Sequence, residues 1–410
     1  MKEKAQAPEL RFDGFTDDWE ERKLKDIAQF NPKTVLPDEF EYVDLESVVG
    51  TEMISHRTES KDQAPSRAQR LAQKGDVFYQ TVRPYQMNNY LYDLPYDNYV
   101  FSTGYAQMRP NIDSYFLLNS VQNKQFVQHV LDRSTGTSYP AINSSDLSKI
   151  EIHVPSKLSE QQKIGAFFQS IDDTIALHQR KLDLLKEQKK GFLQKMFPKN
   201  GAKVPELRFA GFADDWEERK LGEVIDIENG YAFKSEYFSD EEKRHIVLTP
   251  GSVKIGGGFQ KDKGRYYDVS GVFPEKFIFK PGNIFITMTD LTPTAQSLGY
   301  PAIVPRDDNV YLHNQRLGKI INNTTNPEFL YTLLTTDTYH KEIVSSASGT
   351  TVKHSSVSKI LDFKSAIPNI DEQKLIGSFF KELDNTIALH QRKLDLLKEQ
   401  KKGFLEKMFV

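Results

Sequence analysis

The sequence predicts an α+β protein in which two variable domains of mixed α/β structure alternate with two long helices. Three features lead to this prediction: segments that occur twice in the chain, a long heptad pattern of apolar residues after each variable stretch, and short strand-like and helix-like runs between the repeats. Two copies of one unit are expected, with a pseudo-two-fold axis relating them if the two helices pair within the chain.

Two segments of the chain are duplicated almost without change. Residues 8–24 return as 205–221 with two differences, and residues 174–197 return as 386–409 with a single difference, Gln194 against Glu406. The duplications divide the chain into six segments: a first shared segment (1–24), a first variable domain (25–159), a first long helix (160–199), a linker with the second shared segment (200–221), a second variable domain (222–371) and a second long helix (372–410).

The shared segment that opens each repeat, here called the clip (8–24 and 205–221), has no helical or strand period long enough to assign. It contains an Asp-Asp-Trp-Glu-Glu-Arg-Lys run around Trp19 and again around Trp216. The favoured interpretation is a packing element at the base of each variable domain, since one element can serve the same neighbour twice. A binding site is the alternative.

Each variable domain alternates strand-like with helix-like runs, which is typical of mixed α/β structure. Strands are predicted over 76–82, 98–102, 276–279 and 283–288, and helical patterns over 115–131 and 327–344. The tyrosines between 79 and 105 are expected in the sheets and core rather than as platforms for stacked bases. The Gly256-Gly257-Gly258 cluster predicts a hairpin or loop, because no strand–glycine–helix unit surrounds it.

The two long helices carry a heptad seam, with steps that alternate between four and three residues. Ser159 is the expected N-cap of the first helix, and about 38 residues at ~1.5 Å each make a rod of roughly 57 Å. The predicted seam residues are Ile164, Phe168, Ile171, Ile175, His178, Leu182, Leu185 and Phe192 in the first helix, and Ile376, Phe380, Leu383, Ile387, His390, Leu394, Leu397 and Phe404 in the second.

A single helix cannot bury such a seam, so each helix needs a partner. Pairing of the two helices within one chain is the favoured prediction, and pairing between chains is the alternative. The residues themselves leave parallel and antiparallel pairing open. His178 and His390 occupy the same heptad position, which favours a polar layer that sets register over a pH-dependent switch.

The composition excludes several classes of protein. Lys and Arg number 54 and Asp and Glu 57, so a net charge of −3 argues against binding of nucleic acid by bulk charge but leaves a local basic groove open. The chain has no cysteine, which excludes disulfides and thiolate metal sites and fits a cytoplasmic protein. No apolar run approaches the length of a membrane span, and the first residues lack the apolar stretch of a signal peptide.

Recognisable catalytic motifs are missing from the sequence. It contains no phosphate-binding P-loop, no H-E-x-x-H metal motif and no G-x-S-x-G elbow. We therefore expect no catalytic residue and no metal site in this chain.

Polar residues that follow the predicted strands, or that lie in glycine-containing stretches, are candidates for contact with DNA. Arg, Gln and Asn read base edges, and Thr touches bases or phosphates. Any polar loop resembles such a cluster, so a structural role is the alternative for each residue. The candidates are Gln80, Thr81, Arg83, Gln86, Asn88, Asn89, Thr135 and Thr137 in the first domain, and Lys254, Lys261, Lys263, Arg265, Thr287, Thr289, Thr350 and Lys353 in the second.

Taken together, the duplicated segments resemble those of specificity (S) subunits of type I restriction–modification systems. The likeness rests on the Pro-Glu-Leu-Arg-Phe-x-Gly-Phe-x-Asp-Asp-Trp-Glu-Glu-Arg-Lys-Leu opening and on the long helices that begin near Glu160-Gln161 and Glu372-Gln373. It extends over the whole chain, including the alternation of two variable domains with two shared helices.

This resemblance implies that the variable stretches are target recognition domains, each reading one half of a split, asymmetric site in double-stranded DNA. It implies an antiparallel coiled coil that sets the spacing between half-sites. It further implies as partners two adenine-N6 methyltransferase (M) subunits, which bind S-adenosylmethionine, and motor/nuclease (R) subunits, which use ATP and Mg. No cofactor is expected on this chain. The alternatives are a methyltransferase or nuclease fused to recognition domains, and a coiled-coil scaffold that binds no DNA.

Overall fold

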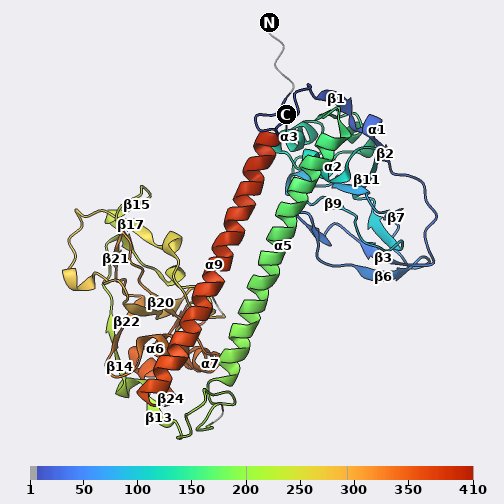
Figure 1. The fold of residues 1–410 in the computed structure, drawn as a ribbon. Helices are drawn as coiled ribbons and strands as arrows, with labels where there is room; N and C mark the ends of the chain where they lie inside the picture. The colour runs from blue at the N-terminus through green and yellow to red at the C-terminus, as the bar shows by residue number, and fades with distance from the viewer. Residues whose placement is uncertain (1–6, 200, 293, 410) are drawn as a thin grey trace. The chain divides into compact units, whose positions relative to one another are not determined.

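The computed structural model describes residues 7–199, 201–292 and 294–409, and the chain forms two compact units. Unit 1 comprises residues 1–180 and 391–410, and unit 2 comprises residues 181–390. Each unit therefore contains one variable domain, one clip and a part of both long helices (Figure 1). Among the described residues, every helix is too short or too polar to cross a lipid bilayer.

The domain of unit 1 is built on two four-stranded sheets with the strand orders β2-β11-β8-β9 and β6-β3-β10-β7. Its strands are β1 (Glu20–Lys23), β2 (Ala28–Phe30), β3 (Glu39–Val43), β4 (Val48–Val49), β5 (Glu52–Met53), β6 (Arg57–Ser60), β7 (Ala68–Leu71), β8 (Val77–Gln80), β9 (Tyr90–Leu91), β10 (Tyr99–Ser102), β11 (Tyr105–Pro110) and β12 (Glu151–Val154). Its helices are α1 (Leu24–Ile27), α2 (Ser114–Val121), α3 (Lys124–Asp132), α4 (Ser144–Leu147) and the first part of α5 (Leu158–Lys195).

Strand β8 is buried along its whole length because its two faces pack on different partners. Val77 and Tyr79 point into a cluster with Phe116 of α2 and other apolar residues of the helices. Phe78 points the opposite way and stacks on Phe101, with ring centroids 3.7 Å apart. Alternation along the strand thus joins the helical layer to the second sheet.

The domain of unit 2 repeats this plan with the sheets β14-β22-β18-β20 and β15-β17-β16-β21. Its strands are β13 (Glu217–Lys220), β14 (Ile225–Asn229), β15 (Phe238–Ser239), β16 (His245–Val247), β17 (Arg265–Tyr267), β18 (Ile284–Thr287), β19 (Thr289–Asp290), β20 (Pro301–Ile303), β21 (Val310–Leu312), β22 (Leu317–Asn322), β23 (Lys353–His354) and β24 (Lys364–Ile367). Its helices are α6 (Pro327–Leu333), α7 (Asp337–Ser346), α8 (Val357–Leu361) and the first part of α9 (Ile370–Met408).

Strand β18 corresponds to β8. Ile284 and Ile286 point into the cluster that contains the helices, whereas Phe285 packs on Phe279 in the second cluster. In both units a glycine with positive φ, Gly75 or Gly282, turns the chain into this strand.

Most predicted elements of the variable domains are confirmed, with three corrections. The strands predicted over 76–82, 98–102 and 283–288 are β8, β10 and β18. The strand predicted over 276–279 is wrong, because a 3₁₀ turn occupies Glu275–Phe277. Each predicted helical run is two helices instead of one, since a capping side chain, Asn123 or Thr336, starts a new helix within it.

The third correction concerns the start of the first long helix. Helix α5 begins at Leu158, so Ser159 lies inside it and is not its N-cap. The prediction missed that the chain already turns into the helix at Lys157, whose carbonyl accepts a hydrogen bond from the Glu160 amide.

Helices α5 and α9 pair antiparallel, as contacts inside each unit show. In unit 1 Phe167 contacts Phe404 and Asp172 pairs with Lys401, so the position in α9 decreases as the position in α5 increases. Unit 2 has the same order, with Lys189 on Asp384 and Phe192 on Phe379. All the predicted seam residues are buried or half-buried, whereas a set of leucines on other faces is exposed: Leu177, Leu184, Leu389 and Leu396.

The two ion pairs of the seam are equivalent positions of the repeat. The Lys189 Nζ–Asp384 Oδ1 and Lys401 Nζ–Asp172 Oδ1 distances are both 2.6 Å. Burial raises the pKa of Asp172 above its ordinary value, although the ion pair with Lys401 acts in the opposite direction. A lysine in an apolar seam is accommodated because an aspartate of the facing helix neutralises it.

Candidate nucleic-acid interface

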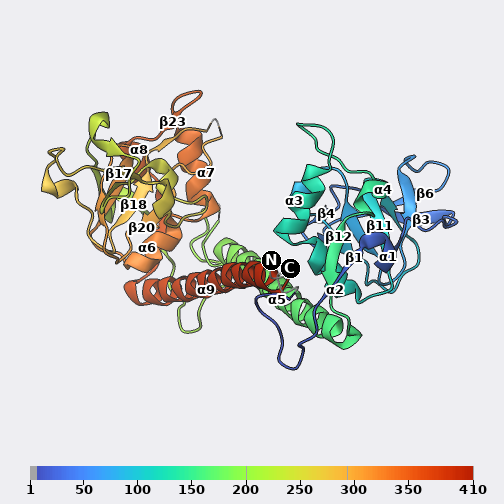
Figure 2. The same ribbon diagram turned by 90° about the horizontal axis from the view of Figure 1, so that it is seen from above.

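In unit 1 two loops that are distant in the sequence meet at the end of strand β8. The first loop (81–89) follows β8, and the second loop (134–141) follows α3. They are joined by an antiparallel bridge between Val82 and Ala141 and by a hydrogen bond of 2.7 Å from the Arg83 amide to the Pro140 carbonyl. In Figure 2 the loop after α3 projects on the side of the domain away from α5. These two loops are called the paired loops of unit 1.

Three of the predicted contact residues lie beneath the paired loops and support them. Gln80, Thr81 and Asn89 are all buried. The Gln80 amide group donates to the Val82 carbonyl at 2.7 Å, and the Thr81 hydroxyl donates to the Gly104 carbonyl at 2.8 Å. Because these side chains are bonded inside the domain and turned away from solvent, their position indicates a scaffold role and not a place on the surface.

Other candidates of unit 1 lie on the surface of the paired loops. Gln86, Thr135 and Thr137 are exposed and Arg83 is half-buried. Asn88 accepts a hydrogen bond of 2.8 Å from the Gly50 amide through its side-chain oxygen. The structure therefore brings together residues that are more than forty positions apart in the sequence, although their contact with DNA stays a prediction.

Unit 2 contains the equivalent paired loops, the segments 288–297 and 348–354. Strand β19 follows β18 and pairs antiparallel with β23, so that Thr289 faces His354 and Asp290 faces Lys353. Ser348 and His354 bridge at the base of the second loop, as Thr135 and Ala141 do in unit 1. Figure 2 shows the segment around β23 on the side of the domain away from α9.

Asp290 organises the first of these loops in unit 2. Its two carboxylate oxygens accept hydrogen bonds from the amides and hydroxyls of Thr292 and Ser297, at 2.6–2.7 Å. Burial acts to raise the pKa of Asp290, but these hydrogen bonds outweigh it and hold the pKa below its ordinary value. Thr287 and Thr289 are buried here, and their hydroxyls bond to Ser297 and His354, whereas Thr350 is exposed.

The remaining candidates of unit 2 do not belong to its paired loops. Arg265 lies on β17 of the other sheet, where its guanidinium is 4.1 Å from the Phe238 ring centre. Lys261 and Lys263 are exposed in a 3₁₀ turn just before β17. The exposed Lys254 starts the glycine hairpin that was predicted, in which Val253 bridges Phe259 and all three glycines have positive φ.

Two exposed tyrosines of the paired loops, Tyr85 and Tyr139, were not predicted as contact residues. Tyr139 is 71% exposed and Tyr85 is 49% exposed, so the core assignment is wrong for Tyr85, and it is also wrong for Tyr96, which is 58% exposed. It holds for the buried Tyr79, Tyr92, Tyr99 and Tyr105. A signal for Tyr139 existed, because it lies between a Ser-Thr-Gly-Thr-Ser turn and Pro140, where a large side chain has no strand to pack in.

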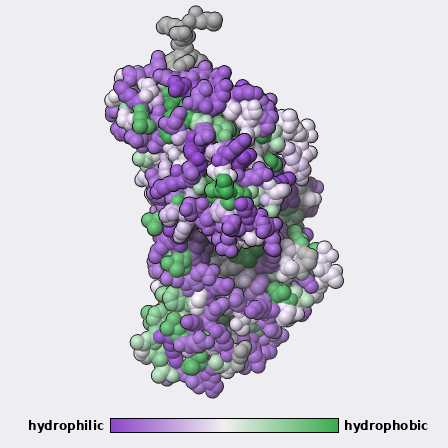
Figure 3. All heavy atoms as spheres, turned by 90° about the vertical axis from the view of Figure 1, so that its right-hand side faces the viewer, coloured by the Kyte–Doolittle hydropathy of each residue, from purple (hydrophilic) through white to green (hydrophobic). Residues whose placement is uncertain are grey.

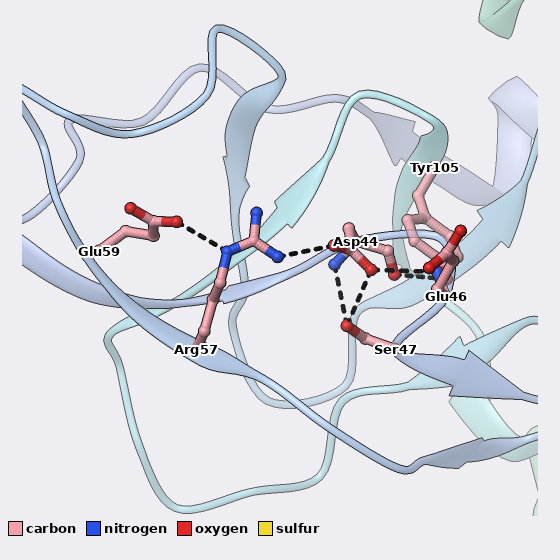
Figure 4. A network of polar contacts seen from close by, with 6 residues as sticks. All are labelled: Asp44, Glu46, Ser47, Arg57, Glu59 and Tyr105. Carbon is pink, nitrogen blue, oxygen red and sulfur yellow. Dashed lines mark hydrogen bonds and ion pairs between the residues drawn. The ribbon is translucent and has the colours of Figure 1, made fainter.

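Elsewhere in the domain of unit 1 charged side chains neutralise one another, as the network in Figure 4 shows. The Arg57 guanidinium donates to Asp44 at 2.8 Å and to Glu59 at 2.7 Å, and Ser47 donates to Asp44 at 3.0 Å. Burial acts to raise the pKa of Asp44, but the hydrogen bonds from Arg57 and Ser47 leave it below its ordinary value. The Arg57 guanidinium is thus bound by carboxylates of the sheet β6-β3-β10-β7 and of the segment that follows β3.

The clips form a second repeated feature, and their contacts support the packing interpretation. In unit 1 the buried Glu160 of α5 accepts hydrogen bonds from Arg11 at 2.6 and 2.9 Å and from the Trp19 indole at 3.3 Å. In unit 2 Glu372 binds Arg208 and Trp216 in the same way, at 2.7, 2.8 and 3.2 Å.

Each clip also holds the C-terminal end of a helix inside its own unit. The Leu10 amide donates to the carbonyl of Lys407 in α9, and the Leu207 amide donates to the carbonyl of Lys195 in α5, both at 2.8 Å. Next to these bonds Trp19 packs edge-on against Phe409, and Trp216 packs edge-on against Phe197. The clip thus clamps the start of one helix and the end of the other.

A family model described as "Type I restriction modification DNA specificity domain" matches the chain twice, over residues 16–187 and 213–399. The chain belongs to this family. The two matches coincide with the two repeats, so both repeats are copies of the family's domain.

Individual relatives agree with this assignment. The MjaVIII specificity subunit of a type I restriction enzyme from Methanocaldococcus jannaschii is 24% identical over 308 residues, which cover 72% of this chain and 69% of that one. The HindI specificity subunit from Haemophilus influenzae is 26% identical over 176 residues, covering 39% and 37% of the two chains.

Two solved structures share the fold. A type I S subunit from M. genitalium covers 98% of this chain and 99% of its own, with a TM-score of 0.65 and 16% identity. A chain from a study of complex assembly and conformational transition of the type I restriction–modification system covers 95% and 97%, with a TM-score of 0.53 and 20% identity. At these identities the likeness concerns the fold.

Proposed function

We propose that this chain is the DNA-specificity subunit of a type I restriction–modification complex, and that it reads a bipartite, asymmetric target in double-stranded DNA. Its paired loops of unit 1 and unit 2 are the two reading surfaces. The observation that carries the proposal is the contrast within the repeat: the same strand and bridge hold the paired loops in both units, but the side chains on the loops differ. Two copies of one reader with different surfaces suit two different half-sites.

The chain is proposed to act without catalysis of its own. Two methyltransferase subunits, with S-adenosylmethionine, would modify adenine at N6, and motor/nuclease subunits, with ATP and Mg, would cut, in the cytoplasm. The alternative of a fused methyltransferase or nuclease is not favoured, because the family and the relatives that match are specificity domains and subunits.

The proposal is tested by producing the chain together with its methyltransferase subunits and mapping N6-methyladenine over a host genome. We expect one target with two unequal half-sites and a non-specific spacer. A continuous or palindromic target would contradict the proposal, as would methylation that does not depend on this chain.

A matched pair of variants assigns the half-sites. Thr135→Ala/Thr137→Ala changes exposed residues in the paired loops of unit 1, and Thr350→Ala/Lys353→Ala changes the corresponding loop of unit 2. Each double variant should weaken methylation through one half-site only and leave the other unchanged. Equal effects on both half-sites would contradict the assignment of one reader to each unit.

The length of the helices is proposed to set the spacer between the half-sites. One heptad inserted into each helix adds about 10 Å at ~1.5 Å per residue. Because base pairs in duplex DNA are ~3.4 Å apart, the spacer should grow by about 3 base pairs while both half-sites stay the same. An unchanged spacer in the methylated sites would contradict this role.

A further inference from the structure

Arg83 differs from the other arginines of unit 1 by its backbone conformation. Its φ and ψ are both 55°, in the left-handed region that residues with a side chain rarely adopt. The hydrogen bond from its amide to the Pro140 carbonyl holds this conformation in place. Strain of this kind persists where the surrounding structure imposes it, and such positions concentrate at binding sites.

Among the described residues, no carboxylate forms an ion pair with the Arg83 guanidinium. Its Nε atom, like that of Arg70, is buried there without a hydrogen-bond partner. Arg11, Arg57 and Arg109, by contrast, each donate to a carboxylate at 2.9 Å or less. A cation that is partly desolvated and unpaired in the free protein is available to an acceptor on a ligand.

An exposed aromatic ring lies beside this cation. The Arg83 guanidinium carbon is 5.9 Å from the centre of the Tyr139 ring, within the range of a cation–π contact, and Tyr85 lies two positions further along the chain. Tyr139 is more exposed than Tyr85 and Tyr96, the other exposed tyrosines among the described residues. On the face drawn in Figure 3, hydrophobic residues lie in small separate groups within a mainly hydrophilic surface.

We infer that Arg83 and Tyr139 act as one base-reading element for the half-site of unit 1. In this arrangement the Arg83 guanidinium donates to the acceptor edge of a guanine in the major groove, and the Tyr139 ring packs against the guanidinium and the neighbouring base. Arginine suits this task because its planar fork matches the two acceptors of guanine and stacks on aromatic rings. The inference rests on the proposed function and names the residues that carry its specificity in one unit.

A protein partner is the competing ligand, and two observations favour DNA. The clip and the helix ends repeat almost unchanged in both units, as expected for surfaces that meet the same kind of neighbour twice, whereas the Arg83–Tyr139 pair occurs in unit 1 alone. The equivalent positions of unit 2 are Asp290 and Val352, which offer neither a cation nor a ring. A feature that only one unit has suits the recognition of a half-site that differs from the half-site of the other unit.

The test uses the full chain in complex with its methyltransferase subunits. A pool of random DNA duplexes first yields the target of the wild type, and duplexes with single base changes then measure discrimination at every position. The variants are Arg83→Ala, Arg83→Lys, Tyr139→Ala, Tyr139→Phe and the Arg83→Ala/Tyr139→Ala double variant. Thr350→Ala is the comparison variant in unit 2, where any loss should fall on the other half-site.

Arg83→Ala and Tyr139→Ala should each weaken binding of the target about 5- to 150-fold, the range of one good bidentate base contact. Both should abolish discrimination at the same one or two adjacent positions of one half-site. Tyr139→Phe should bind as the wild type does, and Arg83→Lys should fail to restore discrimination because an ammonium group cannot donate in a fork. The double variant should lose less than the product of the two single losses.

Several outcomes would overturn the inference and leave the proposed function standing. The first is wild-type discrimination by Tyr139→Ala. The second is a uniform loss of affinity over all DNA sequences, which indicates contact with phosphates. The third is loss of the methyltransferase subunits with normal DNA binding, which indicates a protein interface. Absence of selective binding by the wild-type complex would instead refute the proposed function itself. Because both side chains reach the surface, unchanged thermal unfolding of each variant serves to exclude a folding defect.

Discussion

The anchoring parts of unit 1 and unit 2 are almost identical, whereas their paired loops share only a framework. Glu160 and Glu372 each bind one arginine and one tryptophan of a clip, with corresponding distances that agree within 0.1 Å. The paired loops differ, by contrast. Unit 1 has a strained arginine beside an exposed tyrosine, and the position in unit 2 that corresponds to this arginine is a buried, hydrogen-bonded aspartate.

The clips and the paired loops differ in how strongly packing restricts their side chains. The clip contacts helix backbone and buried apolar rings, so a change on one side needs a matching change on the other. The paired loops are fastened by backbone hydrogen bonds, which accept almost any side chain. A scaffold of this kind can vary its reading surface without losing its anchor.

The largest effect is expected at the phenylalanine that follows the C-terminal end of each long helix. Phe409→Ala empties a site packed by Trp19, Phe116 and Phe168, and Phe197→Ala empties the equivalent site of unit 2. Removal of a buried phenylalanine costs about 3–5 kcal/mol of the free energy of unfolding. Urea unfolding followed by circular dichroism should give similar losses for both variants. A loss several times larger in one of them would show that the two anchors are not equivalent.

The next effect concerns the buried carboxylates of the clips. Glu160→Ala and Glu372→Ala each leave an arginine without its partner in a site that was closed to water, at a cost of about 3 kcal/mol. The isosteric Glu160→Gln should cost less, because its amide oxygen still accepts hydrogen bonds. Thermal unfolding measures both. Stability equal to the wild type in Glu160→Ala would contradict the anchoring role of this carboxylate.

A smaller effect is expected in the helix seam. Lys401→Met leaves Asp172 without its ion pair, which should cost about 1–2 kcal/mol at neutral pH because the carboxylate retains some access to water. Since burial already holds the folded-state pKa of Asp172 above its unfolded value, the cost falls on the charged form. The deficit should therefore shrink as the pH falls through that raised pKa. A deficit that grows toward acid pH would contradict this sign, and Lys189→Met is the matched variant in unit 2.

The smallest effect concerns the single difference between the duplicated helix ends. In unit 1 Glu406 pairs with Lys124 at 2.7 Å, where α3 begins, whereas in unit 2 Gln194 occupies that helix position and α7 begins with Asp337. Glu406→Gln should lower the melting temperature slightly in low salt and not in high salt, because the pair is exposed. Gln194→Glu, which adds a like charge, should also be mildly destabilising. A salt-independent change would point to packing instead of charge.

The duplicated segments made the organisation of the chain predictable, because near-identical sequence implies near-identical local structure. Strands β8 and β18 were recognised from short apolar runs after a glycine turn. The strand predicted over 276–279 failed because an apolar run of that length has no periodicity that separates a strand from a turn. Likewise, the break at Asn123 within the predicted helix depends on a side-chain cap, which the apolar pattern does not reveal.

The candidate interface was predicted in part. The sequence indicated the loops that contain Arg83 and Thr135, since polar residues followed a strand or a glycine turn. It gave no sign that Gln80 and Asn89 are buried beneath the loop, because burial of a polar side chain depends on partners elsewhere in the chain. Tyr139 was missed for the opposite reason, as an aromatic residue is more often buried than exposed.

The duplicated plan, the long helices with their seam, the mixed α/β domains and the family could be predicted from the sequence, since they follow from local periodicity and repetition. The heptad pattern left the direction of helix pairing open, and the resemblance alone implied the antiparallel course that the contacts between α5 and α9 show. The anchoring of the clips by Glu160 and Glu372 and the contact of Arg83 with Tyr139 became apparent in the folded structure. The physical reason is that each of these depends on contacts between residues far apart in the chain. Such contacts arise from packing and charge pairing in space, which the order of residues along the chain does not display.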